Sequence, residues 1–133
     1  MSNIAVIWDL NDVIFKDFKL DSKTLDIVLK LNSLGVSQYV CTNTRPSTVK
    51  RYTQSISKHF KKIYSCKQWG LVKPNPEVFK RLKKELKEER LYFIDNSLKN
   101  IESSNGQGFI GIQYLSDAQL IDKLKELDMY HDN

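Results

Sequence analysis

The chain alternates short apolar runs with longer segments in which apolar residues recur every three or four positions. A short continuous apolar run is typical of a strand buried on both faces, and the longer spacing indicates a helix that packs along one side. On this basis strands are predicted at residues 3–8, 36–42, 62–66, 91–94 and 109–113.

The first predicted helix lies between the first two strands. Asp21 or Ser22 can cap its start, and Gly35 is a favourable residue just beyond its end. Its expected apolar stripe consists of Leu25, Val28, Leu29 and Leu34.

Proline residues mark the start of two later helices. Pro46 can occupy the first turn of a helix that runs to about Phe60. Pro74 and Pro76 lead into a helix whose apolar face is Val78, Phe79, Leu82 and Leu86. A short helix over residues 100–104 and a final helix over residues 117–127 complete the pattern.

The regular alternation of strands and helices predicts the fold class. Short connections between strand and helix favour a parallel sheet with helices on both faces, an α/β three-layer α/β/α arrangement of Rossmann-like type with about five strands. The length of 133 residues favours one domain over residues 1–133. The stretch from Phe15 to Thr42 holds only one predicted helix and one strand, and the stretch from Thr42 to Lys73 is equally short, so no inserted cap domain is expected.

Charge is distributed unevenly around the net value of +5. Residues 58–90 contain eleven Lys/Arg and four acidic residues, whereas residues 91–133 contain three Lys/Arg and seven acidic residues. A basic segment can attract an anionic partner. Because no nucleic-acid motif or interleaved aromatic pattern accompanies the charge, a solvated helix face is the favoured interpretation and nucleic acid is not expected as a partner.

Cysteine use and hydropathy indicate a cytoplasmic protein. Cys41 and Cys66 lie in apolar strand-like stretches and fit no metal-binding spacing, so buried reduced thiols are expected. No apolar run approaches the length that spans a membrane, and the N-terminal residues do not resemble a signal peptide.

Polar residues follow the predicted strands at the end where parallel α/β sheets bind ligands. These residues are Asp9, Asn11, Asp12, Thr42, Asn43, Lys73, Asp95, Asn96 and Ser97. Carboxylates can bind Mg²⁺, while a lysine and a hydroxyl can neutralise and orient phosphoryl oxygens. The sequence therefore predicts a site that holds a cation and a phosphate together.

The order of these residues resembles that of the haloacid dehalogenase superfamily over nearly the whole chain. Four segments carry the resemblance: Asp9-Leu-Asn-Asp-Val after a hydrophobic strand, Val-Cys-Thr42-Asn at a strand end, Lys73-Pro-Asn-Pro before a helix, and Phe-Ile-Asp95-Asn-Ser at another strand end. A single such segment would be weak support. Four in the family's order, each at a predicted strand end, make the resemblance specific.

The resemblance implies a role for each matching residue. Asp9 would be the nucleophile that forms an aspartyl-phosphate, and its second oxygen would bind Mg²⁺. The main-chain carbonyl of Asn11 would be another metal ligand. Thr42, with Asn43 beside it, would bind phosphate, and Lys73 would neutralise both the nucleophile and the phosphate. Asp95 and Asn96 occupy the positions of the metal-binding acids. In the family, the acid at the position of Asn96 is the one that contacts the metal directly.

Two positions depart from the family pattern. Asn11 stands where the family has the aspartate that protonates the leaving group and then activates water, and an amide does neither at neutral pH. General acid–base catalysis contributes typically ~10²–10⁴-fold. Asn96 replaces a metal-binding carboxylate with a neutral amide, so we expect Mg²⁺ to bind more weakly.

Three functions are therefore compatible with the sequence. The first is a weak Mg²⁺-dependent phosphatase-type hydrolase that uses Asp9 on a phosphorylated small molecule or macromolecule. The second is a catalytically silent pseudoenzyme that keeps the phosphate-binding residues Thr42 and Lys73 and binds a phosphorylated or anionic partner. The third, a protein that retains only the fold, is disfavoured because folding demands none of Asp9, Thr42 and Lys73. As the resemblance implies for capless relatives, the site would be open to large ligands, or closed by a homo-oligomer.

Overall fold

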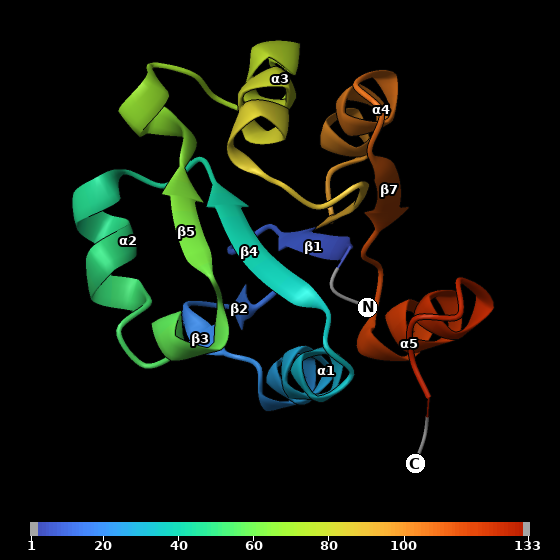
Figure 1. Ribbon diagram of the computed structural model, residues 1–133. Coiled ribbons are helices and arrows are strands. Elements are labelled where there is room, and N and C mark those ends of the chain that lie inside the picture. Colours follow the sequence, from blue (N-terminus) through green and yellow to red (C-terminus); the bar gives the residue numbers. More distant parts are fainter. Residues whose placement is uncertain (1–2, 132–133) are drawn as a thin grey trace.

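A parallel five-stranded sheet forms the centre of the molecule, with the strand order β5-β4-β1-β6-β7 (Figure 1). The computed structural model describes residues 3–131. The strands are β1 (Ile4–Trp8), β4 (Ser37–Thr42), β5 (Lys62–Ser65), β6 (Arg90–Asp95) and β7 (Ile110–Gln113). Each coincides with a predicted strand to within about two residues at either end, so the predicted sheet is confirmed.

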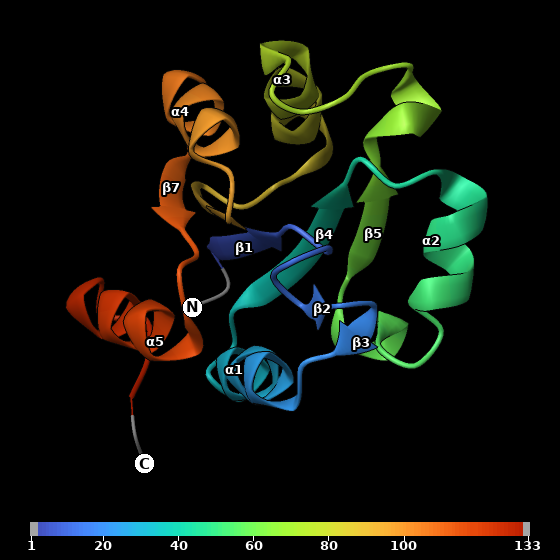
Figure 2. The same ribbon diagram turned by 180° about the vertical axis from the view of Figure 1, so that it is seen from behind.

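Helices cover both faces of this sheet. The α-helices are α1 (Ser22–Ser33), α2 (Pro46–Tyr52), α3 (Pro76–Glu85), α4 (Leu98–Gly106) and α5 (Asp117–Glu126), and two 3₁₀ helices are η1 (Ser57–His59) and η2 (Cys66–Trp69). Helices α1 and α5 lie on one face, α3 and α4 lie on the other, and α2 lies beside the β5 edge (Figures 1 and 2). The predicted three-layer α/β/α architecture is therefore confirmed.

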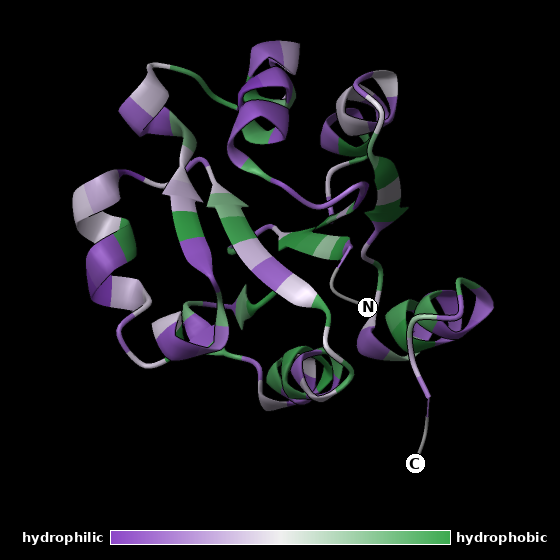
Figure 3. Ribbon diagram, in the orientation of Figure 1, coloured by the Kyte–Doolittle hydropathy of each residue, from purple (hydrophilic) through white to green (hydrophobic). Residues whose placement is uncertain are grey.

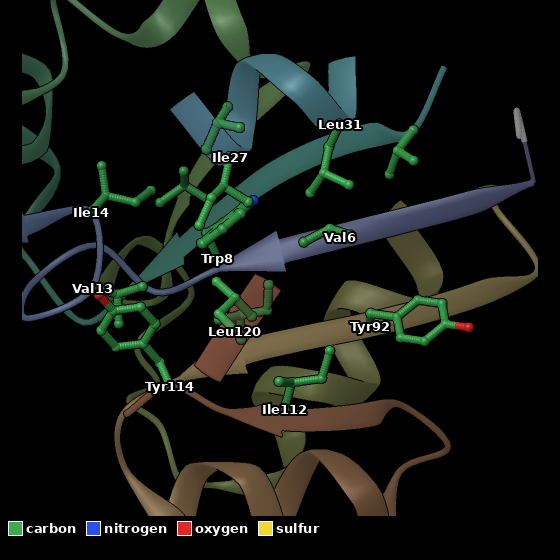
Figure 4. Packing of buried hydrophobic residues seen from close by; sticks show 14 of the residues in the cluster. Val6, Trp8, Val13, Ile14, Ile27, Leu31, Tyr92, Ile112, Tyr114 and Leu120 are labelled. Carbon is green, nitrogen blue, oxygen red and sulfur yellow. The ribbon is translucent and has the colours of Figure 1, made fainter. Parts of the chain in front are cut away.

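Strand β1 divides the hydrophobic core into two parts. Because side chains alternate along a strand, Val6 and Trp8 pack with α1 and α5, whereas Ala5 and Ile7 pack with α3 on the opposite face. Figure 4 shows Trp8 between Ile27 of α1 and the neighbouring strand residues. Figure 3 shows apolar residues, in green, along β1 and β7 and on parts of the helices. Burial on both faces explains why β1 is a continuous apolar run.

Helix α1 begins where the sequence predicts but buries a different stripe. The Asp21 carboxylate caps its start by accepting hydrogen bonds from the N–H groups of Lys23 and Thr24 at 2.9 and 3.0 Å. The buried positions are Thr24, Ile27, Val28 and Leu31. This i, i+3, i+4, i+7 series follows the helical repeat and leaves Leu29 exposed, so the predicted stripe was wrong at Leu29.

Helix α2 ends at Tyr52, about eight residues earlier than predicted. Thr53 follows it and donates its hydroxyl to the carbonyl oxygen of Val49 at 2.7 Å. The next residues, 53–57, are mostly Ser, Thr and Gln, and serine and threonine side chains compete with helical main-chain hydrogen bonds. Pro46 does occupy the first turn, as predicted.

A small antiparallel hairpin after β1 was not predicted. Its strands are β2 (Phe15–Lys16) and β3 (Lys19–Leu20), joined by Asp17 and Phe18 with φ of 49° and 62°. Positive φ at both turn residues suits a tight hairpin turn. The Phe18 side chain is 81 % exposed at the tip. This hairpin lies at the carboxyl end of β1, beside the predicted site.

The course of the chain determines where a ligand can bind. From β1 the sheet grows through β4 and β5 on one side and through β6 and β7 on the other, so the strand order reverses at β1. Ligands of parallel α/β sheets bind at such a switch point, beyond the carboxyl ends of the strands. Asp9 follows β1 directly and lies at this position. Within residues 3–131, none of the helices has the length and apolar character needed to cross a membrane.

Candidate active site

Lys73 lies at the centre of the polar cluster at the switch point. Its ammonium nitrogen donates hydrogen bonds to Asp9 Oδ1 at 2.9 Å and Asp95 Oδ2 at 3.1 Å. It also donates to the carbonyl oxygen of Cys41 at 2.8 Å. An ammonium group has three N–H donors, so all three are used within the protein. Lys73 therefore has no N–H donor left over for a ligand.

Burial controls the charge state of this cluster. The side chains of Lys73, Asp9 and Asp95 are 1 %, 14 % and 0 % exposed. Burial raises the pKa of Asp9 to about 6, although the Lys73 ammonium opposes the shift and the Asp95 carboxylate adds to it. Burial by itself lowers the pKa of Lys73. The opposing effect of Asp9, Cys41 and Asp95 is larger, so the net shift of the pKa is upward. Lys73 is therefore a permanent cation beside Asp9.

Asp95 is fixed by its own neighbours. Its Oδ1 accepts the N–H of Ser97 at 2.9 Å, and its Oδ2 accepts Asn100 Nδ2 at 2.9 Å in addition to Lys73. Asn100, on α4, is thus bonded to a site carboxylate. Both oxygens of Asp95 are thus used within the protein. This geometry suits a residue that orients Lys73 better than a direct metal ligand.

Asn11, Thr42 and Thr44 form a second set of hydrogen bonds at the strand ends. Asn11 Nδ2 donates to Thr44 Oγ1 at 2.9 Å, and Thr42 Oγ1 donates to the same oxygen at 2.9 Å. The Thr44 N–H donates a hydrogen bond to Thr42 Oγ1 at 3.1 Å. Thr44 was missed in the sequence, although it is only two residues after Thr42. Its hydroxyl hydrogen remains available to a ligand because its oxygen serves as the acceptor in both bonds.

Asn43 holds the Lys73 main chain in place. Its Oδ1 accepts the Lys73 N–H at 2.8 Å, and its Nδ2 donates to the Lys73 carbonyl oxygen at 3.1 Å. This reciprocal pair connects the end of β4 to the loop before α3 across thirty positions of sequence. The side chain predicted to bind phosphate is therefore used, at least in part, to position Lys73.

Asn96 lies apart from these bonds. Its side chain is exposed and forms no hydrogen bond with another residue of the described range, while its carbonyl oxygen accepts Gln113 Nε2 at 3.3 Å. Hydrogen bonds through Lys73 thus bring together Asp9, Asn43 and Asp95. Asn11 and Thr42 are joined separately by their bonds to Thr44, while the exposed side chains of Asn96 and Asp12 take part in neither set of bonds within the described residues.

The donor set offers magnesium a single suitable carboxylate. Among residues 3–131, no group of three His, Cys, Asp or Glu side chains is placed to hold a metal ion. Asp95 is already bonded through both oxygens, which leaves the Asp9 carboxylate with the neutral oxygens of Asn11 and Asn96. Magnesium in proteins is often held by one or two carboxylates together with substrate phosphates. These residues therefore fit a weakly held Mg²⁺ whose coordination a phosphate ligand would complete.

The two cysteines lie directly beneath this cluster. Cys41 and Cys66 are both buried free thiols, with their Sγ atoms 3.2 Å apart. The contact with Cys66, together with burial, raises the pKa of the Cys41 thiol well above its usual value. The predicted burial of both cysteines is confirmed. Their link to the site is the Cys41 carbonyl oxygen, which binds Lys73.

Solved structures with the same fold include a hydrolase, a HAD family enzyme and a HAD-like family hydrolase. A hydrolase from Streptococcus pneumoniae TIGR4 superposes with a TM-score of 0.79 over 94% of this chain and 100% of its own, at 14% identity. A HAD family enzyme from Bacteroides thetaiotaomicron has a TM-score of 0.73 over 84% of this chain and 94% of its own, at 15% identity. That structure is an aspartate-to-alanine mutant in complex with magnesium and inorganic phosphate.

A predicted HAD-like family hydrolase from Porphyromonas gingivalis gives a TM-score of 0.71 over 98% of this chain and 100% of its own, at 14% identity. No protein-family model and no curated protein matches the sequence. The similarity therefore lies in the fold: this chain has the HAD-like fold, in a form without an inserted cap between β1 and α3.

Proposed function

We propose that this chain is a phosphohydrolase-type domain that binds a phosphate monoester at the carboxyl edge of its sheet and transfers the phosphoryl group to Asp9, with slow turnover. The observation that carries the proposal is the bond of 2.9 Å between Lys73 Nζ and Asp9 Oδ1, within a buried trio that Asp95 completes. Folding alone does not require a buried lysine between two carboxylates, because such a group is costly to desolvate. The trio lies at the switch point of a fold shared with phosphate-binding HAD enzymes.

The net charge of the site implies that a phosphate ligand binds together with a cation. With Asp9 ionised, two carboxylates and one ammonium leave the trio with a net charge of −1. A phosphate dianion would be repelled unless another cation neutralised it. Mg²⁺ bound by Asp9, the Asn11 carbonyl and Asn96 would supply that charge and polarise the phosphoryl oxygens. Thr42 and Thr44 would offer hydroxyl groups to the same oxygens.

The first chemical step needs no acid when the leaving group is good. An Asp9 carboxylate oxygen forms a bond to phosphorus as the bond from phosphorus to the leaving oxygen breaks, and the electron pair departs with that oxygen. Lys73 holds the carboxylate in place and compensates its charge. Hydrolysis of the resulting aspartyl-phosphate requires a base for water, and Asn11 cannot act as one. The second step is therefore the slow one.

Turnover of p-nitrophenyl phosphate with Mg²⁺ tests this function. Asp9→Asn keeps the shape of the side chain but removes the nucleophile, so it should abolish turnover. Asp12→Asn is the matched control, because Asp12 is an exposed neighbour with φ of 64°, a backbone conformation that asparagine adopts readily. Equal rates in the wild type and in Asp9→Asn would rule out a phosphohydrolase that uses Asp9.

A silent binding domain is the second candidate, and the bond between Asn11 and Thr44 favours it. In that case phosphate binds without reacting. Inorganic phosphate titrated by calorimetry with Mg²⁺ present would then bind the wild type, while p-nitrophenyl phosphate would not turn over. A phosphorylated macromolecule could reach the site, because no cap is inserted between β1 and α3.

A further inference from the structure

A groove of about 370 Å³ lies at the β5 edge of the sheet, between α2 and β5. Figure 1 shows α2 beside β5, at the edge where the sheet ends. The base of the groove is apolar, with Val49 and Phe60 buried and Ile63 partly buried. The lysines that line it are Lys50, Lys61 and Lys62, and all three are exposed.

The charge around this groove has one sign. Residues 27–76 contain nine Lys/Arg and no aspartate or glutamate. Seven of these cations are exposed on and around α2, η1, β5 and η2: Arg45, Lys50, Arg51, Lys58, Lys61, Lys62 and Lys67. Within the described residues, Lys61 is the one of the seven that forms an ion pair, a long one of 3.8 Å to Glu88. A surface of this kind attracts an anionic partner.

The edge strand adds main-chain recognition to the charge. β5 is the last strand on its side of the sheet, and an edge strand presents unpaired N–H and C=O groups that can pair with an extended chain. Residues 61–63 and 65 line the groove, so this edge faces it. An added strand with alternating side chains can place apolar groups on the floor and charged groups at the rim.

We propose that this groove, formed by α2 and β5, binds an extended acidic segment of a partner protein, with apolar side chains on Val49, Phe60 and Ile63 and carboxylates facing Lys50, Lys61 and Lys62. A protein segment is favoured over a nucleic acid because single-stranded bases stack on exposed aromatic rings. The one aromatic ring in the lining, Phe60, is only 7 % exposed. The inference does not depend on the proposed function.

The groove is connected to the candidate active site through one hydrogen bond. Ser65, at the groove end of β5, donates its hydroxyl to the carbonyl oxygen of Thr44. Thr44 in turn accepts hydrogen bonds from Asn11 and Thr42. A segment bound along β5 would therefore approach the loop that carries the predicted phosphate-binding residues.

The test uses a fluorescein-labelled peptide of about eight residues that alternates glutamate and valine. Fluorescence anisotropy gives its affinity for the wild type and for two double variants. Lys50→Glu/Lys62→Glu reverses the rim charge, whereas Lys84→Glu/Lys99→Glu makes the same change in net charge at exposed positions on α3 and α4. We expect the first variant to weaken binding about tenfold or more and the control to stay within about twofold.

Two further measurements locate the contact and identify its chemistry. Amide shifts in two-dimensional NMR should be largest for residues 49–53 and 61–65 on addition of the peptide. An oligothymidylate of similar length should bind more weakly than the peptide. Absence of peptide binding at millimolar concentration, equal effects of the two double variants, shifts confined to another face, or tighter binding of the oligonucleotide would each overturn the proposal. Turnover of p-nitrophenyl phosphate should be unchanged in Lys50→Glu/Lys62→Glu.

Discussion

The side-chain amide of Asn11 donates a hydrogen bond of 2.9 Å to the hydroxyl of Thr44. This bond gives the position of the missing acid–base group a structural partner, and it connects the β2–β3 side of the site to the loop after β4. A carboxylate at residue 11 could accept a hydrogen bond from the same hydroxyl. The exchange of amide for carboxylate is therefore compatible with the surrounding structure.

Asn11→Asp should raise the rate of phosphate release. The new carboxyl group can protonate a leaving oxygen and then activate water, so we expect an increase of about 10²-fold or more for an alkyl phosphate. For an aryl phosphate, kcat should also rise, because hydrolysis of the aspartyl-phosphate is the slow step, but kcat/KM should rise less, because aryloxide leaves without protonation. Steady-state kinetics on both substrates measure the two effects. Combining Asn11→Asp with Asp9→Asn is the control, and a gain that survives the loss of Asp9 would contradict the assigned roles.

Lys73→Met should destabilise the fold. The substitution leaves Asp9 and Asp95 as neighbouring buried carboxylates without their shared cation, at a cost of about 3 kcal/mol in the free energy of unfolding. Urea denaturation at neutral pH measures the change. Adding Asp95→Asn removes one unpaired charge, so the double variant should be more stable than the sum of the single effects predicts. Strict additivity would show that the three groups are not coupled.

Asp21→Asn should reduce stability in a pH-dependent way. Burial by itself raises the pKa of Asp21. The hydrogen bonds from Lys16 and from the Thr24 N–H have a larger, opposite effect, so the net shift of the pKa is downward. A carboxylate with a lowered pKa stabilises the folded state above its unfolded pKa, and this contribution is lost as the pH falls through the folded value.

The variant keeps an N-cap acceptor for α1 but loses the 2.8 Å ion pair with Lys16. We expect a loss of about 0.5–1 kcal/mol at pH 7 that fades below about pH 4. Thermal unfolding across this pH range measures it, with Asp122→Asn on α5 as an exposed control. A difference that is independent of pH would show that the ion pair does not carry the effect.

Much of this fold could be predicted from local pattern. Strands β1 and β6 contain continuous apolar runs, and the starts of α1 and α2 are marked by Asp21 and Pro46. The β2–β3 hairpin could not be predicted, because strands of two residues contain no periodicity and the turn at Asp17 and Phe18 lacks glycine. The early end of α2 depends on side-chain hydrogen bonding by Thr53, which outweighs the weak apolar pattern that follows.

The candidate site was predictable as a set of strand-end residues, but its internal bonds were not. Sequence order placed Asp9, Thr42, Lys73 and Asp95 at one edge. It could not show that Lys73 uses all three N–H donors within the protein, or that Asn100 binds Asp95. It also gave no sign that Thr44 joins Asn11 to Thr42. These relations depend on side-chain direction across strands distant in sequence.

The direct test of the central claim is to look for a phosphoryl group on Asp9. The wild type is mixed with p-nitrophenyl phosphate and Mg²⁺, and the reaction is quenched in acid. The protein is then digested, and the mass of the peptide that contains Asp9 is measured by mass spectrometry. Because Asn11 cannot activate water, we predict that the aspartyl-phosphate accumulates in the wild type, is reduced in Asn11→Asp and is absent from Asp9→Asn. A wild-type peptide that carries no phosphoryl group, or a phosphoryl group that remains in Asp9→Asn, would contradict the account.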